Sequence, residues 1–133
     1  MPHVPIIMPQ LGESIAEARI VQFLVKPGDQ IEADQDLIEV VDLRSIKPLD
    51  TDTVMASVAR TGRLLCVGEA WPWGGVTAEV IARVASEGFG LLDVPPQRLN
   101  AKDTPVPYHP NLWTAHRPTA RAVAAAARKI LRQ

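Results

Sequence analysis

The stretch that decides the fold is "EVVDLRSIKPLDTDTVMASVARTGRLLCVGEAWPWGGVTAEVIARV", which runs from residue 39 to residue 84. Within it, residues 51–62 predict a helix, because Asp50 can cap the first turn and Gly62 can end the last one. Residues 63–67, "RLLCV", contain a short continuous apolar run after Arg63. Such a run is typical of a strand that is covered on both faces in a parallel sheet. The stretch therefore predicts an α/β fold.

The same alternation continues toward the carboxyl terminus. Residues 76–88 predict a second helix whose valines share one stripe, and residues 95–101, "PPQRLNA", predict a short strand. A proline-rich connection is expected around residues 105–110, and a last helix is expected to begin near residue 118. Helix and strand therefore alternate to the end of the chain.

The first third of the chain has the pattern of β structure. Residues 17–25, "EARIVQFLV", and residues 36–43, "DLIEVVDL", are rich in branched and aromatic side chains, and residues 4–9, "VPIIMP", are a third strand candidate. The turn "KPGD" at residues 26–29 fits a connection between antiparallel strands. Because about 40 residues of sheet are too few to sustain a core of their own, this unit should need a partner surface.

Length and composition exclude several classes of protein. The chain has 133 residues and a mass of 14.5 kDa, which allows one domain or two very small ones. Hydrophobic residues make up 47% and charged residues 22%, which is a globular balance. The single cysteine, Cys66, excludes an internal disulfide and is too little for a thiolate zinc site. No membrane segment or signal peptide is recognised, so a cytoplasmic location is expected.

The charges divide unequally along the chain. Residues 1–45 carry a net charge of −5 and the remainder carries +4, and no acidic residue follows Asp103. Such asymmetry is typical of two modules or of a basic docking surface. Nucleic acid is not expected as a partner, because no run of basic residues and no exposed aromatic platform accompanies the positive charge.

Residues 8–40, "MPQLGESIAEARIVQFLVKPGDQIEADQDLIEV", resemble the amino-terminal half of a lipoyl domain, the swinging-arm carrier of 2-oxo acid dehydrogenase complexes. The segments "LGESI" and "VKPGD" carry the resemblance, which covers residues 4–42. It implies a lysine that carries lipoate, and Arg44 falls about where that lysine belongs. A guanidinium stays protonated and cannot form the amide, so this chain is not expected to be an acyl carrier.

Residues 38–133 are similar to another family, the carboxy-terminal, transketolase-type domain of the beta subunit of thiamine-dependent 2-oxo acid dehydrogenases. "DLRSIKPLD" and "PVPY" carry this second resemblance. It implies a three-layer α/β domain that here lacks the family's first strand and helix. The parent complex uses thiamine diphosphate and lipoate, and the resemblance implies that the missing regions supply the thiamine contacts. No cofactor is therefore expected to be bound by this chain alone.

The two resemblances together predict a mixed α/β fold. Its first part, residues 1–42, is a half-lipoyl antiparallel β unit. Its second part, residues 43–133, is a truncated, transketolase C-terminal-type three-layer α/β domain. Because half of a lipoyl fold exposes apolar faces and unpaired strand edges, we expect a homodimer joined through residues 1–45.

The sequence predicts no catalytic, cofactor-binding or metal site. His3, His109 and His116 are far apart in the sequence, which favours exposed or backbone-bonded histidines over metal ligands. Cys66 lies in an apolar run, which favours a buried and inert thiol. Glu69 follows that run, at the position where α/β proteins place ligands, but alone it is a weak indication.

Two surface features have a structural and a functional interpretation. The loop "WPWGG" (71–75) is either a structural turn or an anion site at a helix start, and Trp71 and Trp73 are either packed side chains or anchors of an interface. The arginine face of the last helix, made by Arg121, Arg128 and Arg132, is either solvated or a docking surface.

The functional hypothesis is a non-catalytic chain related to the beta subunit of 2-oxo acid dehydrogenases, which acts in subunit assembly or docking. An acyltransferase core or an alpha subunit would then be the partner. One alternative is a part of a thiamine-dependent oxidoreductase that other chains complete. Another is a recombined or deleted gene product with no selected activity. Neither a membrane nor a nucleic acid is an expected partner.

Overall fold

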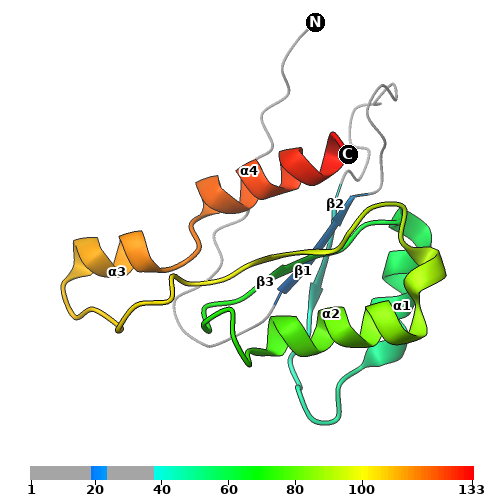
Figure 1. The fold of residues 1–133 in the computed structure, drawn as a ribbon, viewed down its shortest axis with the longest axis horizontal. Helices are drawn as coiled ribbons and strands as arrows, with labels where there is room; N and C mark the ends of the chain where they lie inside the picture. The colour runs from blue at the N-terminus through cyan, green and yellow to red at the C-terminus, as the bar shows by residue number, and fades with distance from the viewer. Residues whose placement is uncertain (1–18, 24–37) are drawn as a thin grey trace, which may run out of the picture.

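The computed structural model describes residues 19–23 and 38–133 (Figure 1). These residues form four short strands, four α-helices and one 3-10 turn. The elements in chain order are β1 (Arg19–Phe23), β2 (Ile38–Asp42), α1 (Thr51–Thr61), β3 (Leu65–Val67), α2 (Val76–Glu87), η1 (Phe89–Leu91), β4 (Gln97–Leu99), α3 (Pro110–His116) and α4 (Ala120–Leu131).

The strands form one mixed sheet in the order β2-β1-β3-β4. Strand β1 runs antiparallel to both neighbours, with Val21 opposite Val40 of β2 and opposite Leu65 of β3. Strands β3 and β4 are parallel, with Cys66 opposite Arg98. The predicted mixed α/β class and the predicted parallel pairing are confirmed.

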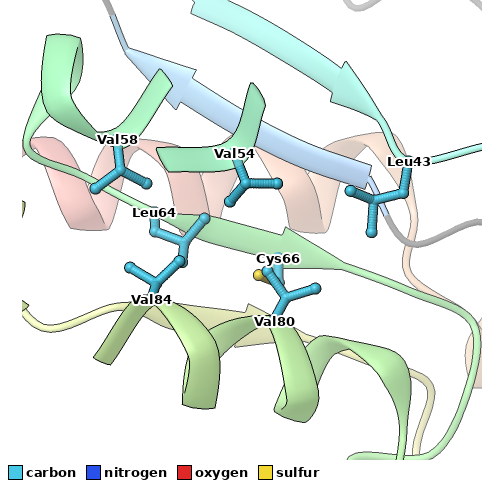
Figure 2. Close-up of a cluster of buried hydrophobic side chains, with 7 residues drawn as sticks. All are labelled: Leu43, Val54, Val58, Leu64, Cys66, Val80 and Val84. Carbon is cyan, nitrogen blue, oxygen red and sulfur yellow. The ribbon is translucent and has the colours of Figure 1, made fainter. Parts of the chain in front are cut away.

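Helices cover both faces of the sheet (Figure 1). Helices α1 and α2 lie on one face and α4 lies on the other. Figure 2 shows the first of the two cores, where valines of α1 and α2 meet Leu64 and Cys66 around β3. Leu65 points the opposite way and packs with the residues of α4. Successive side chains of a strand alternate between the two faces of the sheet, so residues 64–66 contribute side chains to both cores.

Local signals set the ends of α1. The side chain of Asp50 accepts a hydrogen bond from the backbone N–H of Thr53 at 3.0 Å, and Gly62 ends the helix in the left-handed conformation with φ 64°. Both caps are as predicted from the sequence. At the start of the helix the Asp50 side chain accepts from a free backbone N–H, and at its end the N–H of Gly62 donates to the carbonyl oxygen of Val58. Without these two caps, both backbone groups would lack partners.

The region expected to be only a proline-rich connection contains a further helix. Helix α3 begins at Pro110, and the His109 side chain accepts a hydrogen bond from the backbone N–H of Asn111. A proline at the first helical position loses no hydrogen bond, because that N–H has no partner inside the helix. The sequence interpretation treated Pro110 as a loop residue, and it is a helix start instead.

Strand β1 links the two parts that the sequence analysis separated. Its antiparallel pairing with β2 is as predicted, and the same strand also pairs with β3 of the α/β part. The turn at residues 26–29 and the strand candidate at residues 4–9 lie outside the described residues. The likeness of residues 4–42 to a lipoyl half, and the boundary at residue 42, stay predictions. None of the described helices is long and apolar enough to cross a membrane.

Candidate functional site

The parallel strands β3 and β4 end at the same edge of the sheet. The backbone N–H of Gly68 donates to the carbonyl oxygen of Leu99 at 3.1 Å, so the pairing continues one residue past β3. Loop 68–75 leaves the sheet at this edge and leads into α2. Open α/β sheets bind ligands beyond the carboxyl ends of their strands, so this edge is the place to look for a site.

An ion pair connects the end of β3 to the end of α3. The Nη1 atom of Arg117 lies 3.7 Å from Oε1 of Glu69, and both side chains are more than one third exposed. An exposed pair of this kind contributes about 0 to 1 kcal/mol to stability. Glu69, which the sequence analysis placed at a ligand-binding position, therefore has a cation beside it and is not a free carboxylate.

The aromatic rings of α3 support Arg117. Its guanidinium carbon lies 6.0 Å from the ring centroid of Trp113, at the limit of a cation–π contact. The ring of Trp113 stacks on that of His116 with their centroids 5.9 Å apart. His116 is buried, and its Nδ1 lies 3.1 Å from Oγ1 of Thr104. His116 therefore has a structural role, as does His109 at the start of α3, while His3 lies outside the described residues.

Side chains from β4 and just beyond it fix the loop 68–75. Asn100 Nδ2 donates to the carbonyl oxygen of Ala70 at 2.9 Å, and Arg98 Nη1 donates to that of Pro72 at 2.6 Å. The hydroxyl of Thr77 in turn donates to Oδ1 of Asn100 at 3.0 Å. Backbone carbonyls of the loop are thus held by hydrogen bonds from the neighbouring strand. The loop is a fixed platform for the side chains that it presents.

The side chains on this platform are two tryptophans. Trp71 is 48% exposed and Trp73 is 77% exposed. The sequence left open whether they pack inside the chain or anchor an interface, and the exposure of Trp73 favours the second interpretation. A large apolar ring on a fixed backbone loses little conformational entropy when a partner covers it.

Further apolar side chains are exposed on the neighbouring segment. Val106, Tyr108 and Leu112 all lie more than half exposed, in "PVPY" and α3. Figure 1 places this segment and the loop 68–75 toward the same end of the molecule. An end of the molecule that carries several exposed apolar side chains is typical of a protein–protein contact.

Other predicted positions have no part in this edge. Cys66 is buried in the core, as predicted, and desolvation raises the pKa of its thiol to about 12. Arg44 is exposed and its Nε lies 3.3 Å from the Asp42 carboxylate. Among the residues that the structure describes, no group of three or more His, Cys, Asp and Glu side chains could hold a metal ion.

Thiamine diphosphate, which the sequence resemblance implies for the parent enzymes, does not fit the residues at this edge. A carboxylate that exchanges a proton with a cofactor works best when it is withdrawn from solvent. The carboxylate here, Glu69, is partly solvated and has Arg117 as its partner. Glu69 thus has Arg117 as its ionic partner in this structure.

Sequence reasoning missed Arg117 and Asn100. Arg117 was one of several basic residues in the second part of the chain, and nothing near it in the sequence points to Glu69. Asn100 was part of a predicted strand end without a role. Both act through partners more than twenty positions away.

The chain was compared with known protein families and with curated proteins. The family "Transketolase, C-terminal domain" matches residues 15–123, a range that begins before β1 and not near residue 38 as expected. The chain is 38% identical over 110 residues to the pyruvate dehydrogenase E1 component subunit beta of Rickettsia bellii, covering 83% of this chain and 34% of that protein.

Two further relatives agree with this result. The mitochondrial pyruvate dehydrogenase E1 component subunit beta-1 of Arabidopsis thaliana is 42% identical over 95 residues, covering 71% of this chain and 26% of the relative. The acetoin:2,6-dichlorophenolindophenol oxidoreductase subunit beta of Cupriavidus necator is 44% identical over 94 residues, covering 71% of this chain and 28% of that protein.

The chain thus spans between a quarter and a third of the length of these relatives. Its three-layer fold, its parallel pair of strands and the family match over most of its length agree. The protein belongs to the transketolase C-terminal domain family.

Proposed function

We propose that this chain is a non-catalytic assembly or docking unit of the 2-oxo acid dehydrogenase type. Its relatives are beta subunits of pyruvate dehydrogenase and of an acetoin oxidoreductase. The proposed partners are the alpha subunit and the acyltransferase core of such a complex. Thiamine diphosphate and lipoate would then belong to those other chains.

The observation that carries this proposal is the fixed loop 68–75 with its exposed tryptophans. Arg98 and Asn100 hold the loop by its backbone, and Trp73 is among the most exposed large apolar side chains that the structure describes. Tryptophan is enriched among the few residues that dominate binding energy in interfaces. The Trp73 indole is largely uncovered by the residues that the structure describes, and a solvent-exposed indole on a fixed backbone suits an interface.

Titration calorimetry of the chain with a purified alpha subunit, and separately with a purified acyltransferase core, tests the proposal. We expect heat of binding with at least one of them. Trp73→Ala should weaken that binding about tenfold or more, since truncating such an anchor commonly costs 2 kcal/mol or above. Phe89→Ala is the matched control, because Phe89 is equally exposed but lies in η1, away from this loop.

Two results would contradict the docking role. The first is the absence of binding heat with both partners, and the second is an equal loss of affinity in the Trp73 and Phe89 variants. Turnover of a 2-oxo acid when this chain is mixed with an alpha subunit and thiamine diphosphate would favour the alternative, an enzyme that other chains complete. That alternative has one observation in its favour, namely that the chain spans only part of its relatives.

A homodimer through residues 1–45 is a second element of this proposal. Strands β1 and β2 belong to that range, and β2 is an edge strand in the described sheet. An edge strand offers unpaired backbone groups to another chain. Sedimentation equilibrium should give about twice the chain mass of 14.5 kDa, and a stable monomer at micromolar concentration would show the dimer to be wrong.

A further inference from the structure

Helix α4 has one face in the core and one in the solvent. Val123, Ala127 and Ile130 are buried against the sheet. The exposed face carries Arg121, Arg128 and Lys129, and Arg132 follows as the C-cap residue; we call these four residues the basic stripe. Because residues seven and eleven positions apart lie on nearly the same side of a helix, the three arginines form one row.

The basic stripe has no acidic partner among the described residues, unlike most of the other arginines there. None of its four side chains forms an ion pair within residues 19–23 and 38–133. Arg98 donates to a backbone carbonyl, and every other arginine whose side chain the structure describes lies near a carboxylate. These pairs are Arg44 with Asp42, Arg60 with Glu39, Arg63 with Asp93, Arg83 with Glu79 and Arg117 with Glu69.

Helix stability does not explain the stripe. Arg128 and Lys129 lie in the last turn of α4, where a cation interacts favourably with the helix dipole. Arg121 lies in the first turn, which contains no acidic residue, and a cation there interacts unfavourably with the same dipole. The helix dipole therefore accounts for Arg128 and Lys129 but not for Arg121.

We propose that the basic stripe binds an acidic helix of a partner protein. Along the axis the arginines are separated by about 10 Å and about 6 Å, since a helix rises 1.5 Å per residue. Carboxylates at positions i, i+7 and i+11 of a second helix repeat this row. A guanidinium binds a carboxylate through two parallel hydrogen bonds, which favours arginine at such contacts.

The surface between the arginines supports a helix as the ligand. Ala125 lies within the row and is exposed, and its methyl group lets a second helix approach closely. A lipid surface fits less well, because the apolar face of α4 is buried in the core and cannot enter a membrane. A nucleic acid also fits less well, because α4 has no aromatic side chain on which bases could stack.

This inference rests on the assembly role proposed above, but it concerns a different surface and has its own test. The probe is a synthetic helical peptide of about 20 residues with glutamates at i, i+7 and i+11, long enough to form a helix in water. Binding of the fluorescent peptide to the full chain is measured by anisotropy. We expect saturable binding that weakens as added salt screens the charges.

The variant Arg121→Glu/Arg128→Glu should bind this peptide at least about tenfold more weakly, because two attractive contacts become repulsive. Lys47→Glu/Lys102→Glu is the matched control. It changes the net charge equally at two exposed positions outside α4 and should bind as the parent does. Arg121→Ala/Arg128→Ala should also weaken binding, and circular dichroism of each variant reports whether it is folded.

Three outcomes would overturn the inference. The first is that a peptide of the same composition in scrambled order binds as tightly as the designed peptide. The second is that the control variant Lys47→Glu/Lys102→Glu loses as much affinity for the peptide as Arg121→Glu/Arg128→Glu does. The third is tighter binding of a single-stranded oligonucleotide or of phosphatidylserine vesicles than of the peptide. Failure of the proposed function is distinguishable: it fails if Trp73→Ala leaves docking to the whole partners unchanged, whereas binding of the peptide to α4 should not change with Trp73→Ala in either case.

Discussion

Gly62 shows how a single residue ends α1. Its φ of 64° is in the left-handed region, and a Cβ atom there would meet the carboxylate of Asp93. Most residues other than glycine lose about 1 to 2 kcal/mol in this conformation. We therefore expect Gly62→Ala to lower the free energy of unfolding by at least about 2 kcal/mol, measured by urea denaturation.

Gly90 provides the control for this substitution. It lies in η1, and a Cβ added there would meet nothing within 4 Å. Gly90→Ala should leave the free energy of unfolding unchanged or raise it by about 0.4 to 1 kcal/mol, because alanine restricts the unfolded chain. Equal effects of the two substitutions would show that the conformation of Gly62 is not the cause.

Glu39 connects β2 to α1 through two polar contacts. Its carboxylate accepts hydrogen bonds from Arg60 and from Ser57, each at 2.5 Å. The hydrogen bond from Arg60, followed by that from Ser57, lowers the pKa of Glu39 below the ordinary value of a glutamate. A carboxyl whose pKa is lower in the folded state stabilises the fold above the pKa that it has in the unfolded chain.

That contribution should disappear as the pH falls through the lowered pKa of Glu39. At pH 7 we expect Glu39→Gln to unfold at a lower urea concentration than the parent chain. Well below the lowered pKa, the Glu39 carboxyl of the parent chain is protonated and resembles glutamine. The urea concentrations at the unfolding midpoints of the parent and of Glu39→Gln should therefore converge. Glu79→Gln, which removes an exposed pair within α2, should show little effect at either pH.

Among the elements, β1 has the central position. It lies between β2 and β3, which in the described sheet are joined only through it. In a strand with two neighbours, each backbone N–H points toward one of them, so a proline at any position removes a ladder hydrogen bond. We expect Val21→Pro to destabilise the whole α/β part and not only the amino-terminal region.

Hydrogen exchange at β3 measures this effect. In Val21→Pro the amides of Leu65–Val67 should lose protection, because β3 no longer has its antiparallel neighbour. Val21→Thr keeps the backbone N–H and the branching at Cβ, so it should preserve protection at β3. If β3 stayed protected in Val21→Pro, residues 19–23 would not be the central strand in solution.

At the scale of the whole molecule, Cys66 reports when the fold opens. It is 1% exposed, and the pKa of its thiol is raised to about 12 by burial. Helices α1 and α2 cover the face of the sheet where it packs. A thiol reagent should therefore react only after the sheet and these helices separate.

We expect the native chain at pH 8 to react with a disulfide reagent many times more slowly than the chain in urea. The rate should follow the unfolding equilibrium as urea is added, because opening precedes reaction. Val84→Ala, which leaves a cavity in the same core, should speed the reaction, whereas the exposed Ala85→Ser should not. A native rate close to that of the unfolded chain would mean that Cys66 is not buried.

Elements whose signals are local could be predicted from the sequence alone. Asp50 and Gly62 mark the ends of α1, the valine spacing marks α2, and the apolar run around Cys66 marks β3. Each of these signals acts within one turn of helix or one short strand, so the neighbouring residues contain it completely. The mixed α/β class follows from their order, and the absence of a predicted catalytic group followed from the isolated histidines and the apolar setting of Cys66.

The tertiary structure decided which distant residues became neighbours. Only the assembled sheet places β1 between β2 and β3, brings Arg117 to Glu69, and fixes the tryptophan loop with Arg98 and Asn100. The unpaired backbone groups of a strand edge can hydrogen-bond to any extended segment, and a surface charge can pair with any opposite charge. Neither feature therefore specifies its partner. Which strands and which charges become neighbours is set when all apolar faces are buried together. The free energy gained by that burial over the whole molecule is larger than the free energy of any single one of these contacts.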